Sequence, residues 1–178
     1  LDKRKVLPLV ERTAWNGMLE LNRMAFSDVL PRNSESRAMA VAFRLIRKNY
    51  PHIDWVLSFS DGCQCGDGTI YRASGFVLTG ITKNKHIWKL DTGESITDTQ
   101  LYHMTGFAIS EKRAGKKPFQ NVIGRLSGYQ LRYIYFLNQD ARKRLTVPVL
   151  PFSKIDEMGA GMYKGQPKRD KQATAPDQ

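Results

Sequence analysis

The stretch that decides the fold is WVLSFSDGCQCGDGTIYRASGFVLTG, from Trp55 to Gly80. It begins with an apolar run, Trp55 to Phe59, that has the length and composition of a strand. A loop rich in glycine, aspartate and cysteine follows. Gly68 to Ser74 is then long enough for two helical turns, which Gly75 ends, and Phe76 to Ile81 is a second apolar run. The stretch therefore predicts a strand, a loop, a short helix and another strand.

The sequence before this stretch adds a strand and a long helix. Met18 to Phe26 has the pattern of a strand, and a helix is predicted from Ser34 to Asn49, with Asn33 or Ser34 as its N-cap and Pro51 beyond its end. Strands and helices thus alternate, which predicts an α/β (α+β) fold with a mixed sheet flanked by helices. We expect the three strands to share one sheet and the long helix to pack on its face.

The second half of the chain is predicted to be rich in strands. Thr92-Gly93 has the composition of a turn between two short strands, and Gln130 to Leu137 alternates as a strand does. Leu145 to Leu150 is predicted to pair with Gln130 to Leu137 as a C-terminal β-hairpin. We expect one domain over residues 1–152 and a basic, largely disordered tail over 153–178.

The charge of the chain points to a polyanionic partner. Lys and Arg number 28 against 17 Asp and Glu, a net charge of +11. No apolar run approaches the roughly 20 residues that a membrane span needs, so no membrane span is expected. The charge alone does not separate DNA from RNA or from an acidic membrane surface. The two cysteines are too close in sequence for a relaxed disulfide, which favours the cytoplasm. The basic segments give these candidate phosphate contacts: Lys112, Arg113, Lys116, Lys117, Arg142, Lys143 and Arg144.

The loop after Phe59 is compatible with three kinds of site. Cys63 and Cys65 form a C-x-C pair, but no second pair completes a zinc site. The glycines allow a tight turn, but no Gly-Lys-Ser or Gly-Lys-Thr follows to make a phosphate loop. An active-site floor remains, since α/β sheets place their sites at the carboxyl ends of strands. Asp61 and Tyr71 would act there; in the alternative reading Asp61 caps a helix and Tyr71 belongs to the core.

The order of elements, with YRASGF on the short helix and VLTG after it, resembles the C-terminal half of the GNAT acyltransferase fold. The resemblance covers roughly Met18 to Ile81. It implies a donor site at the start of the long helix, at Arg32, Asn33, Ser34 and Ser36, and an acyl-CoA-like or other activated donor. Glu35 and Arg37 stand where that fold's phosphate loop has glycine or alanine, which disfavours ordinary acetyl-CoA.

Several separated motifs are similar to those of the phage Mom family, which modifies adenine in DNA. They are Leu21-Asn22-Arg23, Pro31 to Ser36, Ser58 to Asp61, and Tyr71. The family also has an early His-Tyr motif, which Leu1 to Asn16 does not contain. We therefore expect the chain to be the C-terminal portion of a longer protein, with the early strands of the fold missing.

The Mom resemblance implies an enzyme that installs a carbamoylmethyl group on the exocyclic amine of adenine. That product blocks host restriction enzymes, so double-stranded DNA in the cytoplasm of a bacterial host is the expected partner. Asp61, Tyr71 and Arg23 occupy the positions that the resemblance marks as functional. Asp61 suits a base, Tyr71 an acid to the leaving group, and Arg23 a contact to an anionic donor. Iron is implied by the resemblance alone, and no metal ligand set is assigned.

Two other functions remain open at this stage. A GNAT-type enzyme that acylates a protein, a tRNA or a small molecule would share the same core. A non-catalytic nucleic-acid-binding module would explain the positive charge equally well, but not the placing of an aspartate and a tyrosine around one strand-to-helix loop.

Overall fold

The computed structural model describes residues 2–22, 24–27, 29–63, 66–105, 115, 121–163 and 166–167. The chain forms two compact units, each with its own hydrophobic core. Unit 1 contains Leu1–Ile81 and Gln130–Gln178, and unit 2 contains Thr82–Tyr129. Unit 2 is therefore an insertion between two segments of unit 1.

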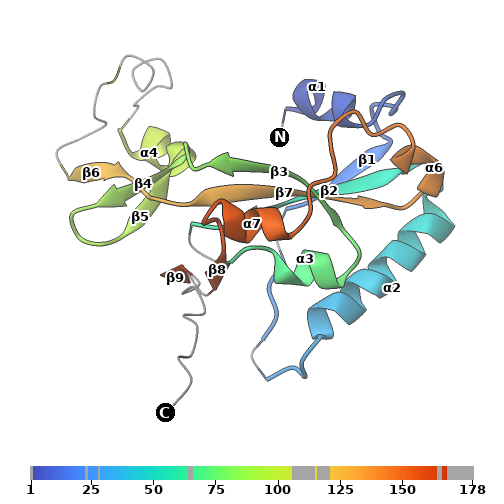
Figure 1. Ribbon diagram of the computed structural model, residues 1–178, viewed down its shortest axis with the longest axis horizontal. Helices are drawn as coiled ribbons and strands as arrows, with labels where there is room; N and C mark the ends of the chain where they lie inside the picture. Colours follow the sequence, from blue (N-terminus) through green and yellow to red (C-terminus); the bar gives the residue numbers. More distant parts are fainter. Residues whose placement is uncertain are drawn as a thin grey trace, which may run out of the picture. The chain divides into compact units, whose positions relative to one another are not determined.

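Unit 1 is built on a four-stranded mixed sheet in the order β1-β2-β7-β3 (Figure 1). The strands are β1 (Met18–Leu21), β2 (Trp55–Asp61), β3 (Val77–Lys83) and β7 (Tyr129–Phe136). β1 pairs with β2 in parallel, and β2 pairs with β7 in antiparallel. The mixed α+β class is confirmed, and the three predicted strands do share one sheet. The first strand, however, ends at Leu21 rather than at Phe26.

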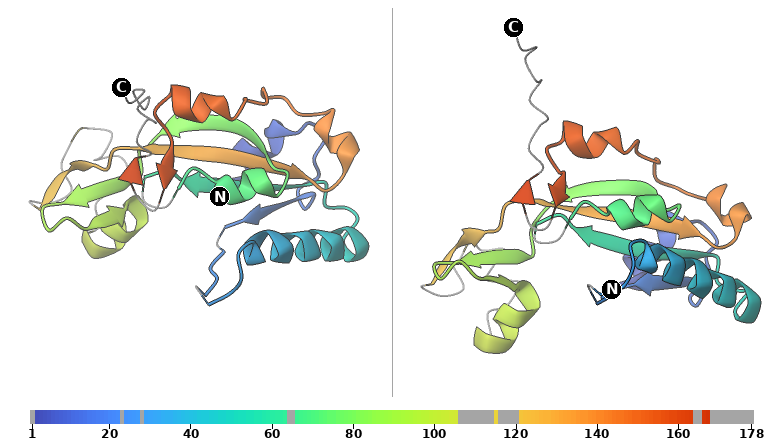
Figure 2. Two further views of the ribbon diagram at one scale, coloured as in Figure 1. Left: turned by 60° about the horizontal axis from the view of Figure 1, so that its bottom comes forward. Right: turned by 90° about the horizontal axis from the view of Figure 1, so that it is seen from below.

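Helix α2 (Ser34–Asn49) forms the crossover that the parallel β1–β2 pair requires. Its bounds are those predicted from the sequence. Phe43 is buried and stacks on Tyr135 of β7, with ring centroids 4.3 Å apart, so the helix packs on one face of the sheet (Figure 2). Asn33 is the N-cap by position, but it adopts a left-handed conformation with φ 67° and makes no side-chain cap bond.

The opposite face of the sheet is covered by short elements. They are α1 (Lys3–Val6), the 3₁₀ turn η1 (Leu7–Leu9) and α6 (Gln139–Arg142). Trp55, Leu57 and Ile134 are fully buried against them. Alternation along β2 explains the arrangement, because Trp55 and Leu57 project to this face and their neighbours project to the face that carries α2.

The predicted C-terminal hairpin is wrong. β7 lies between β2 and β3, whereas Leu145 and Leu150 form isolated bridges with Val10 and Leu78. The alternation of β7 predicts that it is a strand but not which strand it joins. Because β7 lies in the middle of the sheet, the backbone N–H and C=O groups on both of its sides have strands to pair with.

The folded chain continues past residue 152, where the tail was expected to begin. Helix α7 (Ser153–Glu157) is followed by the short strands β8 (Met162–Tyr163) and β9 (Gln166–Pro167). Ile155 is fully buried, and Ala160 is nearly so. Residues 164–165 and 168–178 lie outside the described part of the chain, so the prediction of disorder there is not tested.

In its described residues, unit 2 is a three-stranded antiparallel sheet with helix α4 (Asp98–Thr105) beside it. The strands have the order β5-β4-β6, and Gly93, at φ 87°, makes the predicted turn between β4 and β5. The bounds are β4 (Ile87–Leu90), β5 (Ser95–Thr97), α4 (Asp98–Thr105) and β6 (Val122–Arg125). Its core consists of Trp88, Leu90, Leu101 and Val122.

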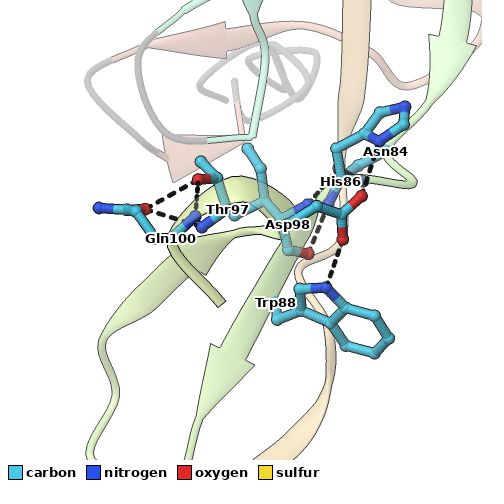
Figure 3. A network of polar contacts seen from close by, with 7 residues as sticks. Asn84, His86, Trp88, Thr97, Asp98 and Gln100 are labelled. Carbon is cyan, nitrogen blue, oxygen red and sulfur yellow. Dashed lines mark hydrogen bonds and ion pairs between the residues drawn. The ribbon is translucent and has the colours of Figure 1, made fainter. Parts of the chain in front are cut away.

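A polar network around Asp98 ties the elements of unit 2 together (Figure 3). The Trp88 indole donates to Asp98 Oδ1 at 2.7 Å, and His86 Nδ1 lies 2.9 Å from Asp98 Oδ2. Asn84 accepts from the backbone N–H groups of His86 and Ile87 and donates to two carbonyls.

Among the helices of the described ranges, none has the length and apolar character needed to cross a membrane.

Candidate active site

The carboxyl end of β2 is folded into a tight turn by its own polar side chains. Asp61 Oδ1 accepts from the backbone N–H of Cys63 at 2.9 Å, and the Asp61 carbonyl accepts from the Gly66 N–H at 3.2 Å. The Ser60 hydroxyl donates to the Gly66 carbonyl at 2.6 Å. Asp61 is half-buried and therefore remains accessible to a substrate at the end of the strand.

Cys63 is buried beneath this turn. Burial raises the pKa of its thiol to about 12, and the nearby Asp61 carboxylate acts in the same direction. The thiol is therefore protonated near neutral pH, which makes it a weak nucleophile and a weak metal ligand. Cys65 lies outside the described residues.

Helix α3 (Thr69–Ala73) begins at a position that only glycine fits well. Gly68 has φ 78°, and an added Cβ would lie 2.5 Å from the ring of Tyr133. The helix places the half-buried Tyr71 between two aromatic rings, with centroid distances of 5.2 Å to Phe76 and 5.3 Å to Tyr133. Within the described part of the chain, no hydrogen bond of the Tyr71 hydroxyl is found.

Asp61 and Tyr71 lie on opposite faces of the sheet. Alternation along β2 directs the Asp61 side chain to the face of Trp55 and Leu57. Tyr71 instead packs against Tyr133, which pairs with Ser58 on the opposite face. The sequence predicted both residues around one loop; the structure places Asp61 at the last residue of β2 and Tyr71 beside Tyr133, on the opposite face of the sheet.

A second carboxylate, Asp67, forms a network that sequence reasoning did not identify. Asp67 is only 2% exposed, and its Oδ1 accepts from the Thr69 hydroxyl at 2.9 Å and from Arg72 Nη2 at 3.2 Å. The Tyr133 hydroxyl donates to the Asp67 carbonyl at 2.5 Å, and burial raises the pKa of this tyrosine. The network fixes the start of α3, and thereby Tyr71.

At the start of α2, where the donor site was predicted, two serine hydroxyls form hydrogen bonds with nearby backbone carbonyls. Ser34 Oγ donates to the Pro31 carbonyl at 2.6 Å, and Ser36 Oγ donates to the Asn33 carbonyl at 3.0 Å. Arg32 is exposed, so its guanidinium is accessible to an anion. The first N–H groups of a helix also favour an anionic ligand, although Glu35 in the first turn opposes it.

The amino-acid sequence matches the model of a known protein family. The model of the Mom protein family matches residues 1–154. The chain belongs to the Mom protein family. It is also similar to the protein named "Methylcarbamoylase mom" of Escherichia phage Mu, with 40% identity over 158 residues. That match covers 82% of this chain and 60% of the phage Mu protein, so the chain spans less than two thirds of that relative.

The basic residues predicted to contact DNA have different environments in this Mom-family chain. Lys143 pairs with Asp140 at 2.7 Å on the surface, an interaction that lowers the pKa of Asp140 and raises that of Lys143. Arg144 binds Asp54 at 2.7 Å and also donates to the Glu11 carbonyl, so its guanidinium braces unit 1. Arg142 is exposed. The remaining DNA-contact candidates lie outside the described residues: Lys112, Arg113, Lys116 and Lys117. Arg23, predicted as a catalytic residue that contacts the donor, also lies outside them.

Proposed function

We propose that this chain carries the catalytic core of a transferase that modifies the exocyclic amine of adenine in double-stranded DNA. The group added is carbamoylmethyl, and its role is to protect phage DNA from restriction enzymes in the cytoplasm of the bacterial host. The observation that carries the proposal is the family match over residues 1–154, a range that includes both Asp61 and Tyr71. The name of the phage Mu relative supports the same reaction.

The chemistry needs a base for the amine and an acid for the leaving group. The adenine nitrogen forms a bond to the methylene carbon of the donor while the bond from that carbon to the leaving group breaks. The nitrogen loses a proton, which Asp61 accepts, and the leaving group gains a proton, which the Tyr71 hydroxyl supplies. The half-buried Asp61 and the Tyr71 hydroxyl, for which the described residues offer no hydrogen-bond partner, suit these roles.

The two faces of the sheet suit the two reactants. Tyr71 and the start of α2 belong to elements that pack on one face, so the donor would bind there, with Arg32, Asn33, Ser34 and Ser36 near its anionic part. Asp61 faces the other side, from which the adenine would approach. Transfer would then occur at the carboxyl end of β2. The parallel β1–β2 pair with α2 between them in sequence supports a GNAT-like half-fold.

The adenine amine is hidden from an enzyme in a stacked duplex, so we propose that the base is flipped into the site. Basic residues would hold phosphates on either side of it. The candidates are Arg142 and Lys143, together with Lys112, Arg113, Lys116 and Lys117. Arg144 would contribute less, because Asp54 already neutralises it.

The described residues do not fit an iron centre. Within the described ranges, no group of three or more His, Cys, Asp or Glu side chains could hold a metal ion. Cys63 has the pKa of its thiol raised to about 12 and is therefore protonated near neutral pH. No step of the proposed reaction is assigned to iron.

The test is a mass spectrum of nucleosides from DNA of cells that express the full-length protein. We expect a modified adenosine with the mass of one added carbamoylmethyl group. Tyr71→Phe should abolish the product, because it removes only the hydroxyl and retains the ring between Phe76 and Tyr133. Unmodified DNA together with turnover of acetyl-CoA would instead favour a GNAT-type N-acyltransferase.

A further inference from the structure

We propose that duplex DNA is seated through its phosphates on a basic surface of unit 1 that is formed by residues 2–12 and 138–147, which we call the α1–α6 surface. The proposal rests on the proposed function, since it names the part of the chain that would hold the DNA substrate. Three features support it: the cations that this surface gathers, a strained arginine within it, and its position on the same side of the sheet as Asp61.

The two segments of the α1–α6 surface are far apart in the sequence but lie side by side in unit 1. An isolated β-bridge joins Val10 of the first segment to Leu145 of the second. The Glu11 N–H also donates to the Arg144 carbonyl at 2.9 Å. Because backbone hydrogen bonds hold the segments together, the charges that they carry belong to one surface.

The α1–α6 surface carries more positive than negative charge. Its two segments contain seven Lys and Arg against three Asp and Glu. Arg144 is bound to Asp54 at 2.7 Å, so its charge is neutralised within the fold. Arg12 and Arg142 are exposed, and no carboxylate of the described residues pairs with either of them. A polyanion that lies on this surface can therefore pair with both.

The ion pairs on the α1–α6 surface are exposed to water. Arg4 and Lys5 both pair with Asp2, at 3.5 and 3.8 Å. Lys143 pairs with Asp140 at 2.7 Å. The side chains of Lys5 and Lys143 are 83% and 79% exposed. Since exposed ion pairs contribute little free energy, these cations can turn from a carboxylate to a phosphate at little cost.

Arg12 adopts a backbone conformation that disfavours arginine. Its φ is 56°, in the left-handed region where glycine or asparagine would be less strained. The Glu11 carbonyl beside it accepts from the Arg144 guanidinium, which holds the turn in place. Strain in a well-held turn points to a use for the side chain. A phosphate contact by the exposed Arg12 guanidinium would be such a use.

The α1–α6 surface lies on the same side of the sheet as the candidate base. Val6 of the first segment and Ala141 of the second belong to the core cluster that contains Trp55 and Leu57. Alternation along β2 directs the Asp61 side chain to this side as well. Trp55 and Leu57 are fully buried under the two segments, whereas Asp61 is half-buried. The cover therefore stops short of the carboxyl end of β2.

The length of β2 fits a duplex that rests on this cover. β2 extends from Trp55 to Asp61, which is about 20 Å at the usual rise of a strand. One turn of B-DNA spans about 34 Å. A duplex seated on the α1–α6 surface can therefore extend past the cover and present a flipped adenine to the open end of β2.

Helix α2 is also basic, but it packs on the opposite face of the sheet. It contains four Lys and Arg against one Glu. One of these, Arg47, donates to the Tyr135 hydroxyl at 2.8 Å. Val41 and Leu45 are 49% and 52% exposed, so part of the outer side of α2 is apolar. Charge alone does not separate the two surfaces, and the direction of the Asp61 side chain favours the α1–α6 surface.

Two matched pairs of cations test the surface. Arg12 and Arg142 changed together to Gln remove two exposed charges from the α1–α6 surface, and Arg44 and Lys48 changed together to Gln remove two from α2. In the full-length protein, we expect the first variant to flatten the slope of log K against log salt by about 1 to 2 for a fluorescent duplex. The second should keep nearly the wild-type slope. Both variants have the same net charge, so equal slopes would overturn the proposal.

Lysine footprinting tests the wild-type protein without any substitution. A duplex should slow the acetylation of Lys5 and Lys143 by acetic anhydride severalfold, as measured by mass spectrometry, and should leave the exposed Lys48 of α2 unaffected. High salt should restore the labelling, because it weakens phosphate contacts. Protection of Lys48 without protection of Lys5 and Lys143 would place the duplex on α2 and overturn the proposal.

The outcomes separate this inference from the proposed function. If the wild type modifies adenine while the two variants share one slope and Lys5 and Lys143 stay unprotected, the DNA is held elsewhere and the function stands. If the duplex protects Lys5 and Lys143 but no adenine is modified, the surface stands and the proposed function fails. If the wild type neither binds nor modifies DNA, both proposals fail.

Discussion

Asp61 and Asp67 are six residues apart, yet the fold treats these two carboxylates in opposite ways. Asp67 is almost fully buried, and a hydroxyl and a guanidinium bind its Oδ1. Asp61 stays half-buried at the strand end and engages one backbone N–H in the turn. A buried and paired charge holds the backbone in place, whereas an accessible one is free to exchange a proton with a substrate. The contrast gives Asp67 a structural role and supports the proposal that Asp61 takes part in the chemistry.

The largest expected effect is on the activity of Asp61→Asn. The amide oxygen can still accept the Cys63 N–H, so the turn should persist, but the base is lost. We expect modification of DNA to fall by roughly a hundred- to ten-thousand-fold, with little change in melting temperature. The loss of activity is measured by single-turnover modification of a duplex by the full-length protein. The melting temperature is measured by thermal unfolding. Near-normal activity would remove Asp61 from the mechanism.

In contrast to Asp61→Asn, the substitution Asp67→Asn should lower the stability of the fold more than it lowers activity. The substitution leaves the Arg72 guanidinium without its counter-charge, and we expect the free energy of unfolding to fall by about 2 to 4 kcal/mol. Denaturant unfolding gives the value. Asp140→Asn, which breaks the exposed pair with Lys143, is the matched control and should leave the unfolding midpoint unchanged. Equal effects of the two variants would contradict a structural role specific to Asp67.

Gly68→Ala tests how tightly the start of α3 is held. The new methyl group would collide with the Tyr133 ring at a position where φ is already positive, so we expect a loss of about 1 to 3 kcal/mol. Gly93→Ala has a similar φ but nothing within 4 Å, so it measures the backbone strain alone. The difference between the two variants, from denaturant unfolding, reports the contact with Tyr133. No difference would mean that the ring moves aside freely.

The smallest effect is expected at Cys63. Because the pKa of its thiol is raised to about 12, the thiolate is scarce at pH 8 and alkylation by iodoacetamide should be slow. In a Cys65→Ser background, mass spectrometry should show labelling at least about a hundredfold slower in the native protein than in urea. The pKa shifts upward because burial favours the neutral thiol over the charged thiolate. Fast labelling of the native protein would show that the turn opens readily.

Sequence reasoning predicted the local elements well because their signals are local. The bounds of α2 follow from Pro31 and Pro51 and from the apolar stripe between them. Asp61 and Tyr71 were predicted as site residues from the motifs of the Mom resemblance around one loop, and that prediction is not tested by the structure. The spacing of ten residues, however, did not reveal that the sheet separates them onto two faces.

Long-range pairings were not predictable in the same way. Tyr133 is 66 residues from Asp67, and only the β2–β7 register brings its hydroxyl to the start of α3. The alternation of β7 was visible in the sequence, but a strand with two apolar faces fits many partners equally well. The erroneous hairpin with Leu145–Leu150 has the same cause, since pairing with the nearest segment was the simplest assumption.

The position of β7 also has a consequence for how the chain folds during synthesis. Leu57 of β2 pairs with Ile134 of β7. More than 70 further residues must therefore be synthesised after Leu57 before β7 can pair with β2. Until then β2 and β3 are open edges that another nascent chain could pair with. Closing the sheet through the last-made strand also raises the mean sequence separation of contacts, which slows folding. Unit 2, whose sheet is made entirely from residues 87–125, can complete its own pairings earlier, while the sheet of unit 1 is still waiting for its central strand.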